Sequence, residues 1–180
     1  GLPVELPASP LSRNERERYR RHIALPEFGE AGQLALRASS VLLVGCGGLG
    51  SPAALYLAAA GVGRLTLVDD DVVERSNLQR QVIHDESRIG QAKVESARDR
   101  VEALNPDVRV EAVRQRLDEA LARRLVGDHD LVVDGSDNFA TRHATNAACI
   151  AAKRPLVYGA VERFGGQVGV FRPGVPGRSC

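Results

Sequence analysis

The chain has 180 residues, 43% of them hydrophobic and 26% charged, with a formal net charge of +1. This length and composition predict one ordinary globular domain with a buried core and leave little room for a second domain. A charge so near zero supplies no basic field, so we expect no nucleic-acid partner.

The sequence carries no sign of membrane or secretory targeting. Its apolar runs are too short to span a bilayer, and no basic region leads into an apolar stretch at the start. The three cysteines form an odd, sparse set that fits a reducing compartment, so we expect a cytoplasmic protein. We also expect residues 1–11 to be a mobile leader. Residues 12–180 then form a single domain that lacks its C-terminal part, because the chain stops on a cysteine directly after a strand.

Two helices are predicted first along the chain. Residues 12–25 are highly charged, and Ser12 with Glu15 forms a capping-box pattern. This segment has few large apolar residues, namely Tyr19, Ile23 and Leu25. We therefore expect it to pack poorly on its own core and to reach a partner subunit. A second short helix is predicted over residues 27–38.

From residue 40 onwards, predicted strands alternate with predicted helices. Strands are expected over residues 41–45, 64–69, 108–113, 130–134, 155–162 and 167–172. Helices are expected over residues 49–60, 91–104, 118–126 and 139–152. This alternation predicts an α/β fold, a doubly wound Rossmann-like sheet with helices on both faces, preceded by an N-terminal helical segment. Residues 163–166 read as a hairpin, so the sheet is predicted to be mixed.

A glycine-rich loop follows the first strand in the pattern Gly45-x-Gly47-x-x-Gly50. Gly47 and Gly48 allow a phosphate to approach the backbone closely, and the next helix favours its negative charge. Asp69, at the end of the second strand, is placed to bind ribose hydroxyls. The pattern alone predicts a dinucleotide-dependent oxidoreductase, and its plainer alternative is a turn that only packs helix on sheet.

Cationic and amide side chains cluster after the second strand. The run at residues 76–81 reads SNLQRQ, and Lys93 opens a later helix. Asn77, Arg80 and Lys93 are the donors and cations that a triphosphate requires. The alternative for Arg80 or Lys93 taken singly is a solvated surface charge, and Asp71 either reaches a metal or lies in a solvated turn.

The fourth strand also ends in acidic residues. Asp137 lies at the same edge of the sheet as the glycine loop, where it is a candidate ligand for Mg²⁺. Its alternative is the N-cap of the helix over residues 139–152. Asp134 ends the strand and can serve structure alone.

No histidine occupies the place of a hydride-transfer catalyst. The four histidines are His22, His84, His129 and His143, and none lies in a motif with a paired acid. Cys46, inside the glycine loop, reads as a small packing residue. The oxidoreductase interpretation therefore lacks its catalytic group.

Taken together, these motifs resemble those of the E1-like adenylating enzymes, in particular the bacterial molybdopterin-synthase and thiamine-biosynthesis adenylyltransferases. The resemblance covers residues 12–180. It rests on Tyr19-x-Arg21-x-Ile23, the loop Gly45–Gly50, Asp69-x-Asp71, Ser76-Asn77-Leu78-Gln79-Arg80-Gln81, Gly90-x-x-Lys93 and Asp137-Asn138. The run at 76–81 is highly specific, whereas the glycine loop by itself is not.

The resemblance implies ATP-dependent adenylation of a small ubiquitin-like sulfur-carrier protein that ends in Gly-Gly, with release of pyrophosphate. A carboxylate attacks the α-phosphorus, so positioning and charge neutralisation are required and a general base is not. The pathway served, molybdopterin or thiamine biosynthesis, stays open. A related enzyme that acts on tRNA or another carboxylate, and an NAD-dependent oxidoreductase, remain alternatives.

The resemblance also implies a role for each matched residue. ATP contacts are expected from Gly45, Gly47, Gly48, Gly50, Asp69, Asp71, Ser76, Asn77, Leu78, Gln79, Arg80, Lys93, Asp137 and Asn138. Catalytic roles are expected for Arg80, Lys93, Asp137, which would hold Mg²⁺, and Arg21, which would reach the triphosphate of the neighbouring subunit in a homodimer. Cys180 would be the first of four cysteine ligands to a structural zinc, with the other three beyond the chain, so zinc is expected in the full-length protein only.

Overall fold

The computed structural model describes residues 9–174. Most of the expected leader, and Cys180 with the zinc site expected there, lie outside these residues. Three helices come first, α1 (Arg13–Arg18), α2 (Arg20–Ile23) and α3 (Gly29–Ala38). The alternating part contains β1 (Ser40–Val44), α4 (Gly50–Ala60), β2 (Arg64–Val68), α5 (Lys93–Leu104), β3 (Arg109–Val113), α6 (Glu119–Val126), β4 (Leu131–Asp134), α7 (Phe139–Ala152), β5 (Leu156–Glu162) and β6 (Gly165–Phe171). None of the described helices has the length and apolarity that crossing a membrane requires.

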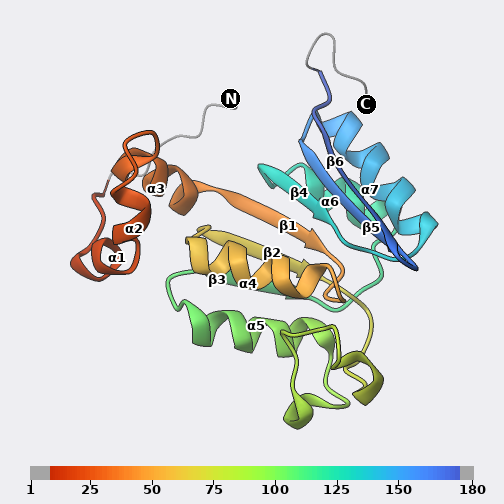
Figure 1. Ribbon diagram of the computed structural model, residues 1–180. Helices are drawn as coiled ribbons and strands as arrows, with labels where there is room; N and C mark the ends of the chain where they lie inside the picture. The colour runs from red at the N-terminus through yellow and green to blue at the C-terminus, as the bar shows by residue number, and fades with distance from the viewer. Residues whose placement is uncertain (1–8, 175–180) are drawn as a thin grey trace.

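The strands form one six-stranded sheet in the order β3-β2-β1-β4-β5-β6 (Figure 1). All neighbouring pairs are parallel except β5 and β6, which are antiparallel and joined by a tight turn at Arg163 and Phe164. The predicted mixed, doubly wound sheet is thereby confirmed. The turn is shorter than expected because β6 begins at Gly165, which pairs with Glu162.

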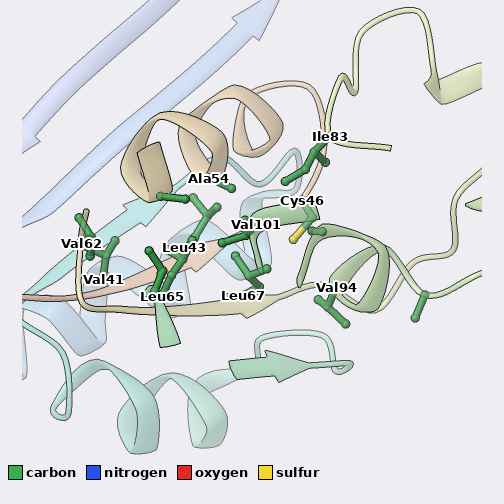
Figure 2. Close-up of a cluster of buried hydrophobic side chains, with 14 residues drawn as sticks. Val41, Leu43, Cys46, Ala54, Val62, Leu65, Leu67, Ile83, Val94 and Val101 are labelled. Carbon is green, nitrogen blue, oxygen red and sulfur yellow. The ribbon is translucent and has the colours of Figure 1, made fainter. Parts of the chain in front are cut away.

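Helices cover both faces of the sheet because the strands carry apolar side chains on both sides. On one face, Leu43 and Leu65 pack against Ala54 of α4 and Val101 of α5 (Figure 2). On the other face, the buried residues of β1 and β4 pack against those of α6 and α7. This two-sided burial explains why the strands read as continuous apolar runs rather than alternating ones.

The chain reverses its winding between β1 and β4, which lie side by side in the middle of the sheet. Val44 pairs with Asp134, so both strands end at the same level. The glycine loop follows β1 and residues 135–138 follow β4, and the two loops touch: a Cβ on Gly45 would lie 3.1 Å from the Gly135 carbonyl oxygen. Open α/β sheets bind ligands at this kind of switch point, beyond the carboxyl ends of the strands.

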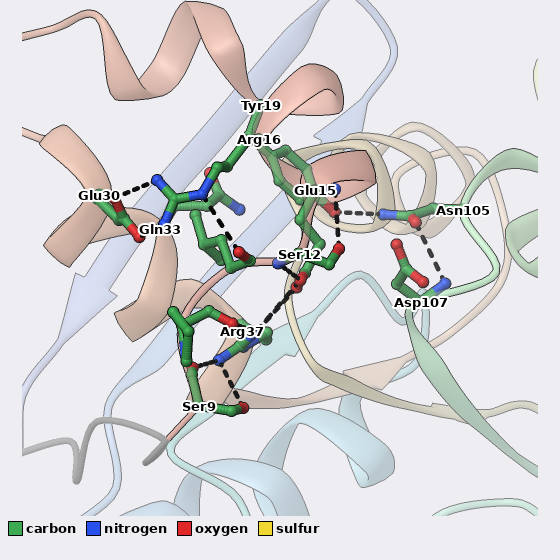
Figure 3. A network of polar contacts seen from close by, with 12 residues as sticks. Ser9, Ser12, Glu15, Arg16, Tyr19, Glu30, Gln33, Arg37, Asn105 and Asp107 are labelled. Atoms are coloured by element: carbon green, nitrogen blue, oxygen red, sulfur yellow. Dashed lines mark hydrogen bonds and ion pairs between the residues drawn. The ribbon is translucent and has the colours of Figure 1, made fainter.

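The N-terminal segment differs from the prediction. The expected helix over residues 12–25 breaks at Tyr19 into α1 and α2. Tyr19 is buried, and its hydroxyl accepts a hydrogen bond of 2.8 Å from Nδ2 of Asn105 (Figure 3). Gly61, with a φ of +89°, leaves room for this ring, since a Cβ there would lie 2.5 Å from the Tyr19 hydroxyl. The expectation that this segment packs poorly on its own core is therefore wrong.

Polar contacts also fasten the N-terminal segment. The capping box of Ser12 and Glu15 is confirmed, and Arg37 forms an ion pair with Glu15 at 3.1 Å (Figure 3). Burial alone raises the pKa of Glu15, but hydrogen bonds from Ser12 and Arg37 outweigh it and bring that pKa below its ordinary value. Glu15 is therefore held ionised as part of the fold.

Candidate active site

A cavity of about 900 Å³ lies at the carboxyl edge of the sheet. Its walls come from the loops that follow β1, β2, β3 and β4 and from the first turn of α7. These loops are distant in sequence and meet only because parallel strands end together. Among the residues expected from the sequence, Gly45, Gly47, Gly48, Asp69, Asp71, Arg80, Lys93, Asp137 and Asn138 line it.

The glycines of the loop serve two different purposes. Gly45 adopts a φ of +90°, and a Cβ on Gly50 would overlap the carbonyl oxygen of Gly45. The turn itself therefore requires these two glycines. By contrast, a Cβ on Gly47 would lie 3.6 Å from Gln81, and one on Gly48 3.6 Å from Arg80, both ordinary contacts. Packing does not explain glycine at positions 47 and 48, whereas close approach of a ligand does.

Asp69 fixes the glycine loop from the end of β2. Its Oδ2 accepts a hydrogen bond of 2.7 Å from the Cys46 N–H, and its Oδ1 accepts one of 2.8 Å from the Asp71 N–H. Between residues 9 and 174 no other hydrogen bond reaches either oxygen, so each keeps capacity to accept another. Asp69 can therefore shape the loop and still accept hydrogen bonds from hydroxyl groups in the cavity.

Two cations flank the loop. Lys93 is only 6% exposed, and its Nζ lies 2.8 Å from Oδ2 of Asp71. Asp71 is exposed, but it is not only a solvated turn residue, because it forms this ion pair with Lys93. Arg80 donates from Nη1 to the Ser76 carbonyl oxygen at 3.1 Å, and its side chain runs beside Gly48. The arrangement places both cations in the wall of the cavity that Gly47 and Gly48 line.

The rest of the run at 76–79 lies outside the cavity lining. Asn77 is buried and caps a single 3₁₀ turn (Arg75–Asn77), because its Oδ1 accepts a hydrogen bond of 3.2 Å from the Glu74 N–H. Ser76 donates its hydroxyl hydrogen to Glu74. Leu78 and Gln79 complete this turn. In the structure these residues hold Arg80 in place and do not themselves line the cavity.

The loop after β4 settles the alternatives for its acidic residues. Oδ1 of Asn138 accepts a hydrogen bond of 2.9 Å from the Thr141 N–H, so Asn138 is the N-cap of α7 and the capping alternative for Asp137 is wrong. Asp134 accepts a hydrogen bond from the Ser136 N–H and is structural. Across residues 9–174, the carboxylate of Asp137 has no hydrogen-bond or ion-pair partner, and it lines the cavity. That carboxylate is thus free to bind a cation.

Comparison with known families decides the relationship of the chain. A model of the ThiF family matches residues 19–180. The chain belongs to the ThiF family. The family assignment thus agrees with the resemblance seen in the sequence motifs.

Individual ThiF relatives extend this finding. A probable adenylyltransferase/sulfurtransferase MoeZ of Mycobacterium tuberculosis is 49% identical over 174 residues, which is 97% of this chain and 44% of the relative. The molybdopterin-synthase adenylyltransferase of Escherichia coli is 52% identical over 161 residues, 89% of this chain and 65% of the relative. The structure of E. coli tRNA N6-threonylcarbamoyladenosine dehydratase, TcdA, in complex with ATP matches with a TM-score of 0.78 and 31% identity, covering 83% of this chain and 61% of that one. This chain therefore spans less than two thirds of each of these proteins.

Two buried polar groups of this ThiF-family chain were not singled out from its sequence. Oε1 of Gln81 and Oγ of Ser136 are buried, line the cavity and find no hydrogen-bond partner in the described part of the chain. Unpaired buried polar atoms are rare in folded proteins because each costs about 1–3 kcal/mol. A polar ligand in the cavity would pair them. The only sequence signal was the position of Gln81 at the end of the specific run.

Two arginines of the cavity wall were also missed. Arg142, on α7, donates from Nε and Nη2 to the Ser136 carbonyl oxygen, at 3.1 and 2.6 Å, and its guanidinium lies 5.1 Å from the centre of the Tyr158 ring. Arg116 forms an ion pair of 3.1 Å with Asp70. With Arg80 and Lys93 they give the cavity positive charge on several sides. Nothing in their sequence spacing marks them, because they reach the cavity from separate elements.

Arg21 lies far from this cavity in the same ThiF-family chain. It is exposed on α2. This segment is fixed beside the C-terminal end of α4, where Nε2 of Gln33 donates to the Ala60 carbonyl oxygen and Oε1 of Gln33 lies 2.9 Å from Nδ1 of His22. The glycine loop lies at the other end of α4, about 16 Å away for an 11-residue helix. Arg21 therefore does not contribute to the cavity of its own chain.

Proposed function

We propose that residues 12–180 form the adenylation domain of a cytoplasmic ATP-dependent adenylyltransferase. Its substrate would be the C-terminal carboxylate of a small ubiquitin-like sulfur-carrier protein ending in Gly-Gly. The observation that carries this proposal is the pair of sterically unexplained glycines, Gly47 and Gly48, which line one cavity together with the buried cation of Lys93. The names of the relatives at about half identity support adenylyl transfer, and the E. coli relative supports molybdopterin biosynthesis as the pathway.

The residues of the cavity fit ATP and Mg²⁺. The backbone N–H groups of Gly47 and Gly48, which no acceptor among the described residues occupies, would bind phosphate oxygens. Asp69 would accept hydrogen bonds from the ribose, and Gln81 and Ser136 would gain the partners that they lack. The free carboxylate of Asp137 would hold Mg²⁺.

The chemistry requires charge neutralisation more than proton transfer. A carboxylate oxygen of the carrier forms a bond to the α-phosphorus, the bond from that phosphorus to the bridging oxygen breaks, and pyrophosphate leaves with the electron pair. ATP supplies both the adenylyl group and this leaving group. Arg80 and Lys93 would bring the two anionic reactants together and offset the charge that builds on the leaving phosphates. No residue needs to remove a proton, because the attacking carboxylate is already ionised.

Arg21 supports a homodimer within this proposal. It lies at the opposite end of α4 from its own cavity, so any action on a triphosphate must take place in a neighbouring subunit. The structural zinc expected at Cys180 would belong to the longer protein. Mixing an Arg21→Ala subunit with a Lys93→Met subunit tests the exchange of residues, because activity would return only if the mixed dimer contains one complete site.

ATP–pyrophosphate exchange by the full-length protein tests the proposed reaction. We expect exchange to be stimulated by sulfur carriers ending in Gly-Gly and not by the same carriers lacking the final glycine. tRNA serves as the second arm, since the TcdA structure is a more distant match at 31% identity. Exchange that depends on tRNA and ignores every carrier would transfer the proposal to the tRNA-modifying class.

A further inference from the structure

His84 lies directly beneath the glycine loop. It is only 6% exposed, and both of its ring nitrogens are engaged: Nδ1 lies 2.8 Å from Oγ of Ser96, and Nε2 lies 3.1 Å from the carbonyl oxygen of Cys46. A carbonyl oxygen can only accept, so Nε2 carries a hydrogen, and when the ring is neutral Nδ1 has none and accepts from the Ser96 hydroxyl. The contacts therefore define one neutral tautomer.

The surroundings of the ring keep it neutral. Burial lowers the pKa of His84, and the nearby charge of Lys93 lowers it further. The hydrogen bond to Cys46 and the charges of Asp69 and Asp85 act in the opposite direction but do not cancel the effect of burial. The Nε2–H donor to the loop is thus present at neutral pH without a second proton on the ring.

The hydrogen bond from His84 determines where the next amide points. The Cys46 carbonyl and the Gly47 N–H belong to one planar trans peptide, in which the two groups point in opposite directions. Because His84 holds the carbonyl on the buried side, the Gly47 N–H is directed away from His84, on the side of the cavity that Gly47 lines. Asp69 holds the preceding peptide through the Cys46 N–H. The Ser51 hydroxyl also donates to the Cys46 carbonyl, at 3.4 Å, so His84 supplies the shorter of the two hydrogen bonds that hold this carbonyl.

We propose that His84 is a positioning residue for phosphate binding, which aims the Gly47 N–H into the cavity by holding the Cys46 carbonyl. The role rests on the proposed nucleotide site, but the orientation of the loop belongs to the ligand-free protein and can be measured there. His84 would touch neither the nucleotide nor the reacting atoms. It acts through the backbone of the loop alone.

Two variants of the full-length protein separate this role from simple burial. His84→Gln keeps an N–H donor at a similar reach, whereas His84→Leu removes it. The matched control is His129→Leu. His129 is also buried, its two ring nitrogens are hydrogen-bonded to Thr66 and to the Leu125 carbonyl oxygen, and it does not line the cavity. The measurements are the amide resonances of Gly47 and Gly48 without ligand, the protonated nitrogen of His84 by ¹⁵N NMR, and the Kd for ATP.

We expect His84→Leu to shift the Gly47 resonance and to raise the Kd for ATP at least tenfold, about 1.4 kcal/mol. His84→Gln and His129→Leu should stay within about threefold of the wild-type Kd. An unmoved Gly47 resonance with wild-type ATP affinity in His84→Leu would overturn the positioning role, as would an Nδ1–H tautomer in the wild-type protein. If His84→Leu does not fold, the positioning role is tested by the tautomer of His84 in the wild-type protein and by the Kd of His84→Gln for ATP. A wild-type protein that binds no ATP defeats the proposed function instead, and the Gly47 shift then still reports on the loop.

Discussion

The buried ammonium of Lys93 lies 2.8 Å from the exposed carboxylate of Asp71 at the edge of the cavity. Removing the ammonium leaves Asp71 in water, which solvates it. We therefore expect Lys93→Met to change the free energy of unfolding by less than about 1 kcal/mol. The same substitution removes a cation from the phosphate site and should lower the exchange rate by about 10²-fold or more.

Arg75→Met is the matched control for Lys93→Met. Arg75 is also paired with a carboxylate, Glu86 at 2.9 Å, but it is exposed and lies outside the cavity lining. Exchange rates and urea unfolding should be measured for both variants. Equal exchange rates in the two would contradict a role for the Lys93 charge.

The glycine loop yields a prediction with opposite outcomes at two positions. Gly48→Ala should fold normally, because its Cβ meets Arg80 at an ordinary 3.6 Å, but should raise the Kd for ATP about tenfold or more. Gly50→Ala should destabilise the protein by about 1–3 kcal/mol or more, since its Cβ overlaps the Gly45 carbonyl. Thermal unfolding and ATP titration check the pair. Destabilisation by Gly48→Ala would show that packing explains this glycine after all.

The neighbours Asp137 and Asn138 should separate chemistry from stability. Asn138→Ala removes the N-cap of α7 and should cost about 1 kcal/mol of stability. Asp137→Asn removes a carboxylate that has no partner among residues 9–174 and should leave the unfolding transition in place, while exchange becomes weak at every Mg²⁺ concentration. Denaturant melts and Mg²⁺ titrations of exchange provide the measurements. A loss of stability in Asp137→Asn would restore the structural alternative for this residue.

Substitution of Gln81 should raise the stability of the ligand-free protein and lower its affinity for ATP. Because its Oε1 is buried and has no hydrogen-bond partner in the part of the chain that the structure describes, Gln81→Leu should stabilise the ligand-free protein by about 1 kcal/mol. It should also weaken ATP binding, since the ligand loses a polar contact. Gln79→Leu is the control within the same run, because Gln79 is exposed and lies outside the cavity lining. If Gln81→Leu leaves the Kd for ATP unchanged, Gln81 does not contact the nucleotide.

The buried histidines should make the protein sensitive to acid. Burial lowers the pKa values of His84 and His129 below the ordinary value of 6.5. The unfolded chain therefore binds protons at a higher pH than the folded one. The free energy of unfolding therefore keeps the full contribution of the neutral histidines above about pH 6.5. It falls as the pH drops below that value, by at most about 1.4 kcal/mol per pH unit for each histidine. Urea unfolding at pH 7.5 and 5.5 measures the loss, which His129→Gln should reduce.

The sequence predicted the sheet well because its strands are buried on both faces and read as unbroken apolar runs. It could not predict the break at Tyr19, since that depends on Asn105, a residue far along the chain that the fold brings against the tyrosine ring. The burial of Gln81 and His84 could not be predicted either, because in the sequence both look like exposed loop residues. Propensity also did not distinguish Asp137 from Asn138 as the helix cap, because both residue types suit that position.

Within residues 9–174, the two buried thiols lie in different layers of the fold. Cys46 belongs to the cluster beneath α4 and α5 (Figure 2), and Cys149 to the cluster beneath α6 and α7. Burial raises the pKa of Cys46, and it raises the pKa of Cys149 to about 12, so neither reacts as a thiolate in the native state. The rate at which either thiol is alkylated therefore measures how often the structure around it opens. Equal rates at both sites would report whole-chain unfolding, whereas faster modification at Cys46 would give the lifetime of the glycine loop in its closed form.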